Sequence, residues 1–147
     1  MIRSRNYSFI LVLLQFLCIL FLLLLNESLF SNRLSLCISS LGFFVGLYAL
    51  MVNKLSNFNI TPEIKEKAKL ITTGAYAYIR HPMYFAVLLI MLGVVTTHFN
   101  LTSGLIYLGL ILILFLKAQK EEKLWSQKST AYKKYMKTTK MFIPFIL

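Results

Sequence analysis

Two short polar clusters stand out in a chain dominated by apolar side chains. The first is Arg80-His81-Pro82, at the start of an apolar run, and the second is Glu121-Glu122, about forty residues later. Because proline disfavours the α conformation in the preceding residue and suits a first helical turn, we expect His81 to lie just before a helix. Free backbone N–H groups at that helix end suit a carboxylate or a phosphate. In an alternative interpretation, Arg80 only contacts lipid phosphates at the membrane surface, and these residues have no catalytic role.

The acidic and aromatic residues near these clusters allow two interpretations. Glu121 and Glu122 are two of only five acids in the chain and lie in a lysine-rich tail, where they could instead form Glu–Lys pairs on a solvated helix face. Tyr76, Tyr78 and Tyr84 provide aromatic faces that could hold a sulfonium or ammonium group. An aromatic belt at a membrane interface explains the same tyrosines.

Four apolar runs must position these clusters. They are Phe9–Leu25, Leu34–Val52, Met83–Thr97 and Leu105–Leu116. As a helix, the first run of 17 residues spans roughly 25 Å, close to the hydrocarbon thickness of a bilayer. The hydrophobic content of 58% exceeds the roughly 45–50% of soluble domains. We therefore predict an all-α, polytopic integral membrane protein with about four transmembrane helices.

The third and fourth runs predict a helical hairpin, because only the short link His98–Gly104 separates them, and Leu101 could extend the fourth helix backwards. This hairpin would bring the Arg80 and Glu121 clusters together at one end. Thr61-Pro62-Glu63 has the pattern of a helix N-terminus. The tail from Lys117 is expected to form an interfacial helix, followed by an apolar segment that returns toward the bilayer.

Positive charges predict the orientation in the membrane. The N-terminus carries two basic residues, the first loop only Arg33, the Asn53–Pro82 loop five, the His98–Gly104 link none and the tail eight. A four-span protein with both termini in the cytoplasm thus keeps 15 of its 16 basic residues inside. The net charge of +11 is therefore interpreted as an attraction to anionic lipids and not to nucleic acid.

Small residues and cysteines add little chemistry. Gly42 and Gly46 have the spacing that lets another helix approach closely. Cys18 and Cys37 have no CxxC partner or nearby histidine, so we predict no metal site.

The 147 residues suit one domain, with two spans in 1–53 and a binding region, hairpin and tail in 54–147. The oligomeric state is left open.

The stretch from Leu70 to Tyr84, with Arg80-His81-Pro82-Met83-Tyr84 at its core, resembles the isoprenylcysteine carboxyl methyltransferase family. The related phospholipid N-methyltransferases share this core. Further features match in order and approximate spacing, namely Glu121-Glu122, Tyr132, Tyr135 and Phe142-Ile143-Pro144. The resemblance covers roughly residues 66–147, whereas the first two runs match only as generic spans.

The resemblance implies S-adenosylmethionine as cofactor and a lipid-like or prenylated acceptor, a carboxylate or an amine, at the cytoplasmic face. It implies membrane lipids and an amphiphilic acceptor as partners. We assign catalytic roles to Arg80 and to Lys117, which stands where the family has a basic residue for the acceptor. The predicted cofactor-binding residues are Leu70, Ile71, Tyr76, His81, Pro82, Met83, Tyr84, Glu121 and Glu122.

Two departures from the family pattern and two alternative functions remain. Ala86 replaces the glycine usual two positions after the motif tyrosine, and Lys128-Ser129 stands near the place of a Phe-Gly pair. Membrane sterol reductases, which bind NADPH, have a similar C-terminal region, but they tend to carry Arg-His-x-Asn-Tyr, whereas Pro82 and Met83 occupy those positions here. A non-enzymatic membrane scaffold is the other alternative.

Overall fold

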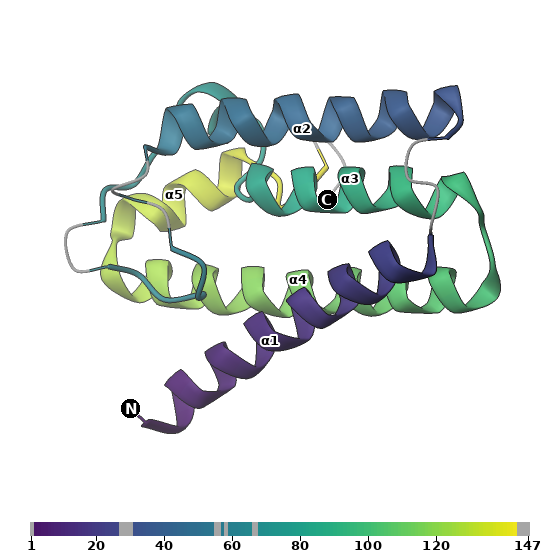
Figure 1. Ribbon diagram of the computed structural model, residues 1–147. Helices are drawn as coiled ribbons and strands as arrows, with labels where there is room; N and C mark the ends of the chain where they lie inside the picture. The colour runs from purple at the N-terminus through teal and green to yellow at the C-terminus, as the bar shows by residue number, and fades with distance from the viewer. Residues whose placement is uncertain (1, 27–30, 55–56, 58, 66–67, 144–147) are drawn as a thin grey trace.

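The computed structural model describes residues 2–26, 31–54, 57, 59–65 and 68–143 and consists of helices (Figure 1). The helices are α1 (Ile2–Leu25), α2 (Arg33–Asn53), the short 3-10 helix η1 (Gly74–Ala77), α3 (Pro82–Thr97), α4 (Leu101–Lys128) and α5 (Thr130–Thr138). Within the described ranges no β-strand forms, and Ile79 and Lys140 make one isolated parallel bridge. The predicted all-α class is confirmed.

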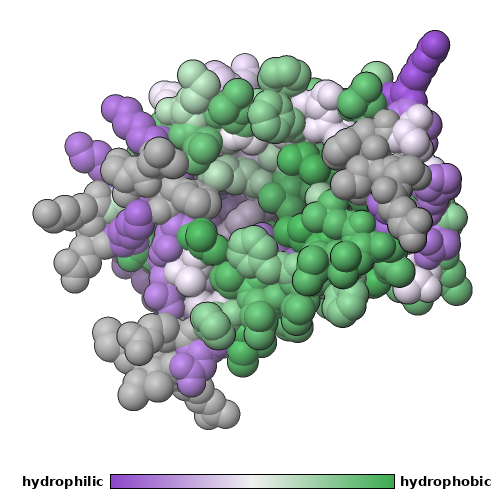
Figure 2. Space-filling model, viewed as in Figure 1, coloured by the Kyte–Doolittle hydropathy of each residue, from purple (hydrophilic) through white to green (hydrophobic). Residues whose placement is uncertain are grey.

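Three of the helices, α1, α2 and α4, are long and apolar enough to cross a membrane. Helix α3 is equally apolar but has only 16 residues, whereas α4 has 28. Large apolar side chains on the long helices face outward, as at Phe9, Phe44 and Leu112, which are 65%, 64% and 57% exposed. Figure 2 shows apolar residues gathered between hydrophilic residues at the two ends of the molecule. This distribution is that of a protein surrounded by lipid.

Helices α2 and α3 lie side by side and pack through small residues (Figure 1). A Cβ atom added to Gly42 would lie 2.8 Å from the backbone nitrogen of Ile90 and 2.9 Å from the carbonyl oxygen of Ala86. The hydroxyl of Ser35 donates to the carbonyl oxygen of Gly93 at 2.7 Å. The glycine spacing in α2 therefore does permit a close helix approach, and the partner is α3.

Helix α1 crosses α4 and is joined to it by polar contacts. The ammonium groups of Lys117 and Lys120 donate to Gln15 Oε1 at 2.6 Å and to Ser8 Oγ at 2.5 Å. Further along, Leu22 packs into the core that α3 and α4 share. Gln15, the one polar interruption of the first apolar run, thus faces a buried lysine and not lipid.

The C-terminal half differs from the prediction in its helix bounds. Helix α4 begins at Leu101, as anticipated, but continues to Lys128, so the segment from Lys117 onward is not a separate interfacial helix. This segment contains no glycine or proline and consists largely of strong helix formers, which favour continuation. The tail helix is instead α5. Of the apolar end that was expected to return toward the bilayer, residues 144–147 lie outside the described range.

The predicted helix at Thr61-Pro62-Glu63 is wrong. The backbone N–H of Glu63 donates to the carbonyl oxygen of Thr61 at 2.7 Å, and the side chain of Asn59 donates to the carbonyl oxygen of Glu63 at 2.8 Å. These bonds hold a tight turn, because side-chain donors such as asparagine compete with the helical pattern. Gly74, with a φ of +59°, is the first residue of η1.

Replacing Gly42 with alanine is expected to destabilise the protein by about 1–3 kcal/mol, because α2 and α3 would have to move apart. The measurement is the free energy of unfolding in mixed detergent micelles, followed by circular dichroism. Gly109→Ala is the matched control, since a Cβ atom there has no neighbour within 4 Å. Alanine should be neutral or stabilising at that position by up to about 1 kcal/mol. Equal effects at both glycines would contradict the close packing of α2 on α3.

Candidate active site

The tail of the chain fixes the segment that enters α3. The backbone N–H of Arg80 donates to the carbonyl oxygen of Lys140 at 2.8 Å, and that of His81 donates to Met141 at 3.1 Å. His81 precedes the helix with φ −124° and ψ 58°, and Pro82 occupies its first turn. Both backbone predictions are confirmed. Backbone hydrogen bonds to the tail hold this segment in place independently of its side chains.

The imidazole of His81 lies between two carboxylates of α4. Its Nδ1 is 3.4 Å from Glu121 Oε2, and its Nε2 is 3.2 Å from Glu122 Oε1. The ring stacks on Tyr84 with 5.4 Å between centroids and 3° between planes, and Phe142 of the tail lies 5.9 Å away. The α3–α4 hairpin thus brings the two polar clusters together, as the sequence predicted.

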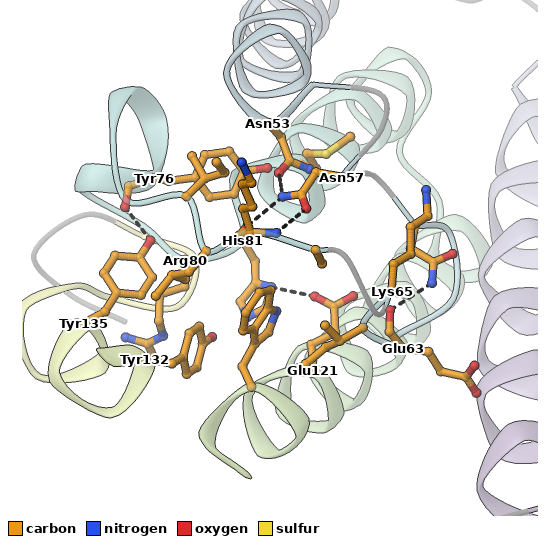
Figure 3. Close-up of a pocket in the computed structure, with 18 of the residues that line it drawn as sticks. Asn53, Asn57, Glu63, Lys65, Tyr76, Arg80, His81, Glu121, Tyr132 and Tyr135 are labelled. Atoms are coloured by element: carbon orange, nitrogen blue, oxygen red, sulfur yellow. Dashed lines mark hydrogen bonds and ion pairs between the residues drawn. The ribbon is translucent and has the colours of Figure 1, made fainter. Parts of the chain in front are cut away.

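Arg80 extends this cluster toward α5. Its Nε donates to Glu122 Oε1 at 2.6 Å, and both side chains are more than nine-tenths buried. The guanidinium also donates to the carbonyl oxygens of Thr139 and Met136. Because the guanidinium binds α4 and the end of α5 at once, Arg80 positions these elements around the start of α3 (Figure 3).

Tyr84 and Glu121 complete a continuous chain of polar contacts. The hydroxyl of Tyr84 donates to Glu121 Oε1 at 2.5 Å, so this carboxylate contacts both a phenol and an imidazole. Glu121 is the more exposed of the two glutamates, with 22% of its side chain accessible against 8% for Glu122. Glu121 is therefore the more accessible carboxylate, whereas Glu122 is paired inside the protein.

The pKa values of the site follow from this arrangement. Burial lowers the pKa of His81, but hydrogen bonds and charge from Glu121 and Glu122 outweigh burial and raise the pKa above its ordinary value. Burial, reinforced by Glu121, raises the pKa of Tyr76, and burial, reinforced by Glu122, raises that of Tyr132. The imidazole therefore favours its charged form, and both tyrosines keep their hydroxyl protons.

An open cleft lies against this cluster, with a volume of about 810 Å³ when its open mouth is included. Seven of the nine predicted cofactor-binding residues line it, together with Arg80 (Figure 3). The seven are Leu70, Ile71, Tyr76, His81, Met83, Tyr84 and Glu121. Pro82 and Glu122 are buried behind the cleft wall, where Pro82 begins α3 and Glu122 pairs with Arg80.

Lys117 and Ala86 lie away from the cleft. The ammonium of Lys117 donates to Gln15 Oε1 at 2.6 Å and to the carbonyl oxygen of Ile60 at 3.1 Å, and it lies 5.1 Å from the ring centroid of Tyr84. Lys117 is thus bound within the protein and does not line the cleft. The Cβ atom of Ala86 would lie 3.2 Å from a Cβ atom added to Gly46 on α2, so the missing glycine affects helix packing and not the cleft wall.

Sequence reasoning missed several residues that line the cleft. The side-chain amide of Asn57 pairs with the backbone of Lys69 through two bonds of 2.9 Å and donates to Asn53 Oδ1 at 2.8 Å. The rings of Trp125 and Tyr132 stack with centroids 5.7 Å apart. The sequence carries a clustering of asparagine in one polar loop, but only the fold brings this loop over α4 and α5. Other missed lining residues are Asn59, Glu63, Ile64, Lys65, Ala68 and Tyr135.

Residues 36–127 match the sequence model of the isoprenylcysteine carboxyl methyltransferase (ICMT) family. The matched range is more than half of the 147-residue chain and includes both polar clusters. The chain belongs to the ICMT family. Searches of curated proteins and of solved structures found no match.

ICMT membership confirms the resemblance, although its extent differs from the prediction. The match begins in α2, which had been regarded as a generic span, and it ends in α4, before the tail tyrosines. α2 supplies the close packing that holds α3, whereas the tail is joined to the site by tertiary contacts. Membership in the ICMT family implies a methyltransferase enzyme, and the apolar helices make it a membrane protein.

Replacing Arg80 with methionine should lower the free energy of unfolding by about 3 kcal/mol, because a buried carboxylate loses its principal partner. The measurement is unfolding in mixed detergent micelles. Arg33→Met, at an exposed position in the first turn of α2, is the control and should change stability by no more than about 0.5 kcal/mol. Similar small losses in both variants would show that the Arg80–Glu122 pair contributes little.

The contribution of His81 to stability should decrease as the pH rises. Its pKa is raised in the folded protein, so the stabilisation is complete below the unfolded pKa of about 6.5 and is lost as the pH rises through the folded pKa. The difference in unfolding free energy between wild type and His81→Gln should therefore be larger near pH ~6 than near pH ~9. A difference that grows with pH would argue against a charged imidazole between the glutamates.

Proposed function

We propose that this protein transfers a methyl group from S-adenosylmethionine to an amphiphilic carboxylate or amine at the cytoplasmic face of a membrane. The observation that carries this proposal is the convergence of seven predicted cofactor-binding residues on one cleft at the end of the α3–α4 hairpin. Family membership supports the reaction class. The sterol-type reductase and the scaffold have no comparable support.

The residues of the cleft fit the chemical groups of such a cofactor. Glu121 and the faces of Tyr76 and Tyr84 suit the positive charges of a sulfonium and an amino group. The flat surfaces of Trp125 and Tyr132 suit an aromatic base.

When bound, the cofactor supplies a methyl group that its sulfonium already activates. The protein therefore needs mainly to position the reactants, which can contribute up to about 7–11 kcal/mol to lowering the barrier. The carboxylate of Glu121 is held by Tyr84 and His81, so its orientation is set before any ligand arrives. Arg80 maintains the same geometry from behind by fixing Glu122.

The distribution of charge supports a cytoplasmic cleft in a four-span protein. The Asn53–Pro82 loop and the tail carry five and eight basic residues, and both contribute to the cleft end of the molecule. The opposite end has only Arg33. By the positive-inside rule the cleft then faces the cytoplasm, with both termini on that side and α3 as the fourth span. A water-soluble cofactor and a lipidic acceptor can meet there.

Calorimetry of S-adenosylhomocysteine binding to the protein in mild detergent tests the proposal. Wild type should bind saturably, and His81→Ala and Glu121→Gln should each weaken the affinity at least about tenfold, or 1.4 kcal/mol. His98→Ala, which changes the other histidine at an exposed position beyond the far end of α3, should bind like wild type. Circular dichroism confirms that each variant is folded. If folded wild type binds no cofactor but binds NADPH, the reductase alternative replaces the methyltransferase.

A further inference from the structure

The cations at the cleft are largely engaged by the protein itself. Arg80 is bound to Glu122, and His81 lies between that carboxylate and its neighbour on α4. Lys117, which was expected to bind the acceptor, is buried against Gln15 and does not line the cleft. The cationic side chains that were predicted from the sequence to lie at the site therefore already bind groups of the protein itself.

Two other lysines line the cleft, but both are exposed. Lys65 and Lys69 belong to the loop that covers one side of the cleft, and their side chains are open to water. Solvent screens exposed charges strongly, so these lysines select weakly for a carboxylate. The carboxylates near the cleft are therefore expected to determine which charged headgroup is selected.

Glu63 lies at the border between the cleft and a second hollow. This hollow is formed by Asn6, Phe9 and Ile10 of α1 together with Thr61 and Glu63 of the loop. Figure 3 shows the side chain of Glu63 pointing out of the cleft toward α1. Glu63 lines both spaces, so a molecule in the second hollow that contacts this residue is adjacent to the cofactor cleft.

The carboxylate of Glu63 is only loosely engaged. Within the described residues it makes no hydrogen bond or ion pair, although its backbone groups bond to Thr61 and Asn59. The charge of Lys120 acts on it from beyond ion-pair distance, and the ammonium of Lys120 donates to Ser8. A negative charge is thus available at the junction of the two hollows.

The second hollow also opens onto the apolar surface of the protein. Phe9 and Ile10 are 65% and 50% exposed and belong to a helix suited to span the membrane. An amphiphile can keep its tail along this surface while its headgroup reaches Glu63. Because Glu63 lines both spaces, a headgroup that contacts this residue borders the cofactor cleft.

We propose that the hollow between α1 and the Thr61–Glu63 turn is the acceptor site, and that Glu63 selects an acceptor whose headgroup is a primary or secondary amine. This inference rests on the proposed function and specifies its substrate class. The ammonium form of the headgroup is attracted by Glu63, whereas a carboxylate headgroup is repelled by it.

The reaction balances without a further reactant. The bound ammonium releases one proton to water at the open mouth, and the nitrogen lone pair then forms a bond to the methyl carbon. The carbon–sulfur bond breaks, and its electron pair stays on sulfur, which becomes a neutral thioether. The product is a methylated ammonium ion, so one proton is released for each methyl group transferred.

The test uses full-length protein in phosphatidylcholine vesicles that contain either hexadecylamine or hexadecanoate, which have tails of equal length. Transfer of a labelled methyl group from S-adenosylmethionine to the extracted amphiphile is measured, and cofactor affinity is measured in parallel. Hexadecylamine should be labelled, and hexadecanoate should be labelled at least tenfold more slowly. Glu63→Gln should reduce kcat/KM for the amine at least tenfold and change the cofactor Kd much less, because the Glu63 side chain points out of the cleft. Glu63→Asp, which retains the charge, should keep most of the activity.

Cofactor affinity separates the two levels of inference. Absence of cofactor binding overturns the proposed function itself. If the cofactor binds, then labelling of hexadecanoate in preference to the amine, or of neither amphiphile, overturns the amine selection. Unchanged amine kinetics in Glu63→Gln would remove Glu63 from the acceptor site.

Discussion

The close contact of four polar side chains, Arg80, His81, Glu121 and Glu122, at one end of the α3–α4 hairpin is the constraint on which the site depends. Arg80 and His81 contact Glu121 and Glu122, and these carboxylates raise the pKa of His81, which favours a charge on the imidazole that offsets theirs. Removing these groups from water is costly, and only opposite charges and backbone carbonyls at close range offset that cost. The cluster therefore requires the start of α3, the end of α4 and the tail to come together, and this same assembly forms the cleft.

The sequence predicts those parts of the site that local chemistry determines. Proline geometry places His81 before α3, and a short link makes a hairpin that brings Glu121 to it. The turn at Thr61 and the loop bonds of Asn57 could not be predicted, because they depend on side chains meeting partners that only the fold brings near. The continuation of α4 was missed because hydropathy marks the membrane boundary, whereas helix propensity continues beyond it.

Helix α1 lies outside the range that matches the ICMT family, yet it is bonded to the structure around the cleft. Lys117 connects Gln15 of α1 with the carbonyl oxygen of Ile60 in the loop, and its ammonium lies near the ring of Tyr84. A shift in the position of α1 would therefore disturb both the loop and the wall of the cleft through Lys117. Residues that affect the cleft can thus lie in a part of the chain that the family pattern does not describe.

The unequal lengths of α3 and α4 also have a mechanical consequence. At 1.5 Å per residue, the 16 residues of α3 extend roughly 24 Å and the 28 of α4 roughly 42 Å, against a hydrocarbon core of about 30 Å. If α3 is the fourth span, as we propose, the bilayer beside it would have to thin or dip, because a span that is too short deforms the lipid around it. The cleft then opens at the bottom of a depression in the membrane surface. Bilayer thickness would then act on this enzyme as a physical control, since the mismatch and the depression would be larger in a thicker membrane and smaller in a thinner one.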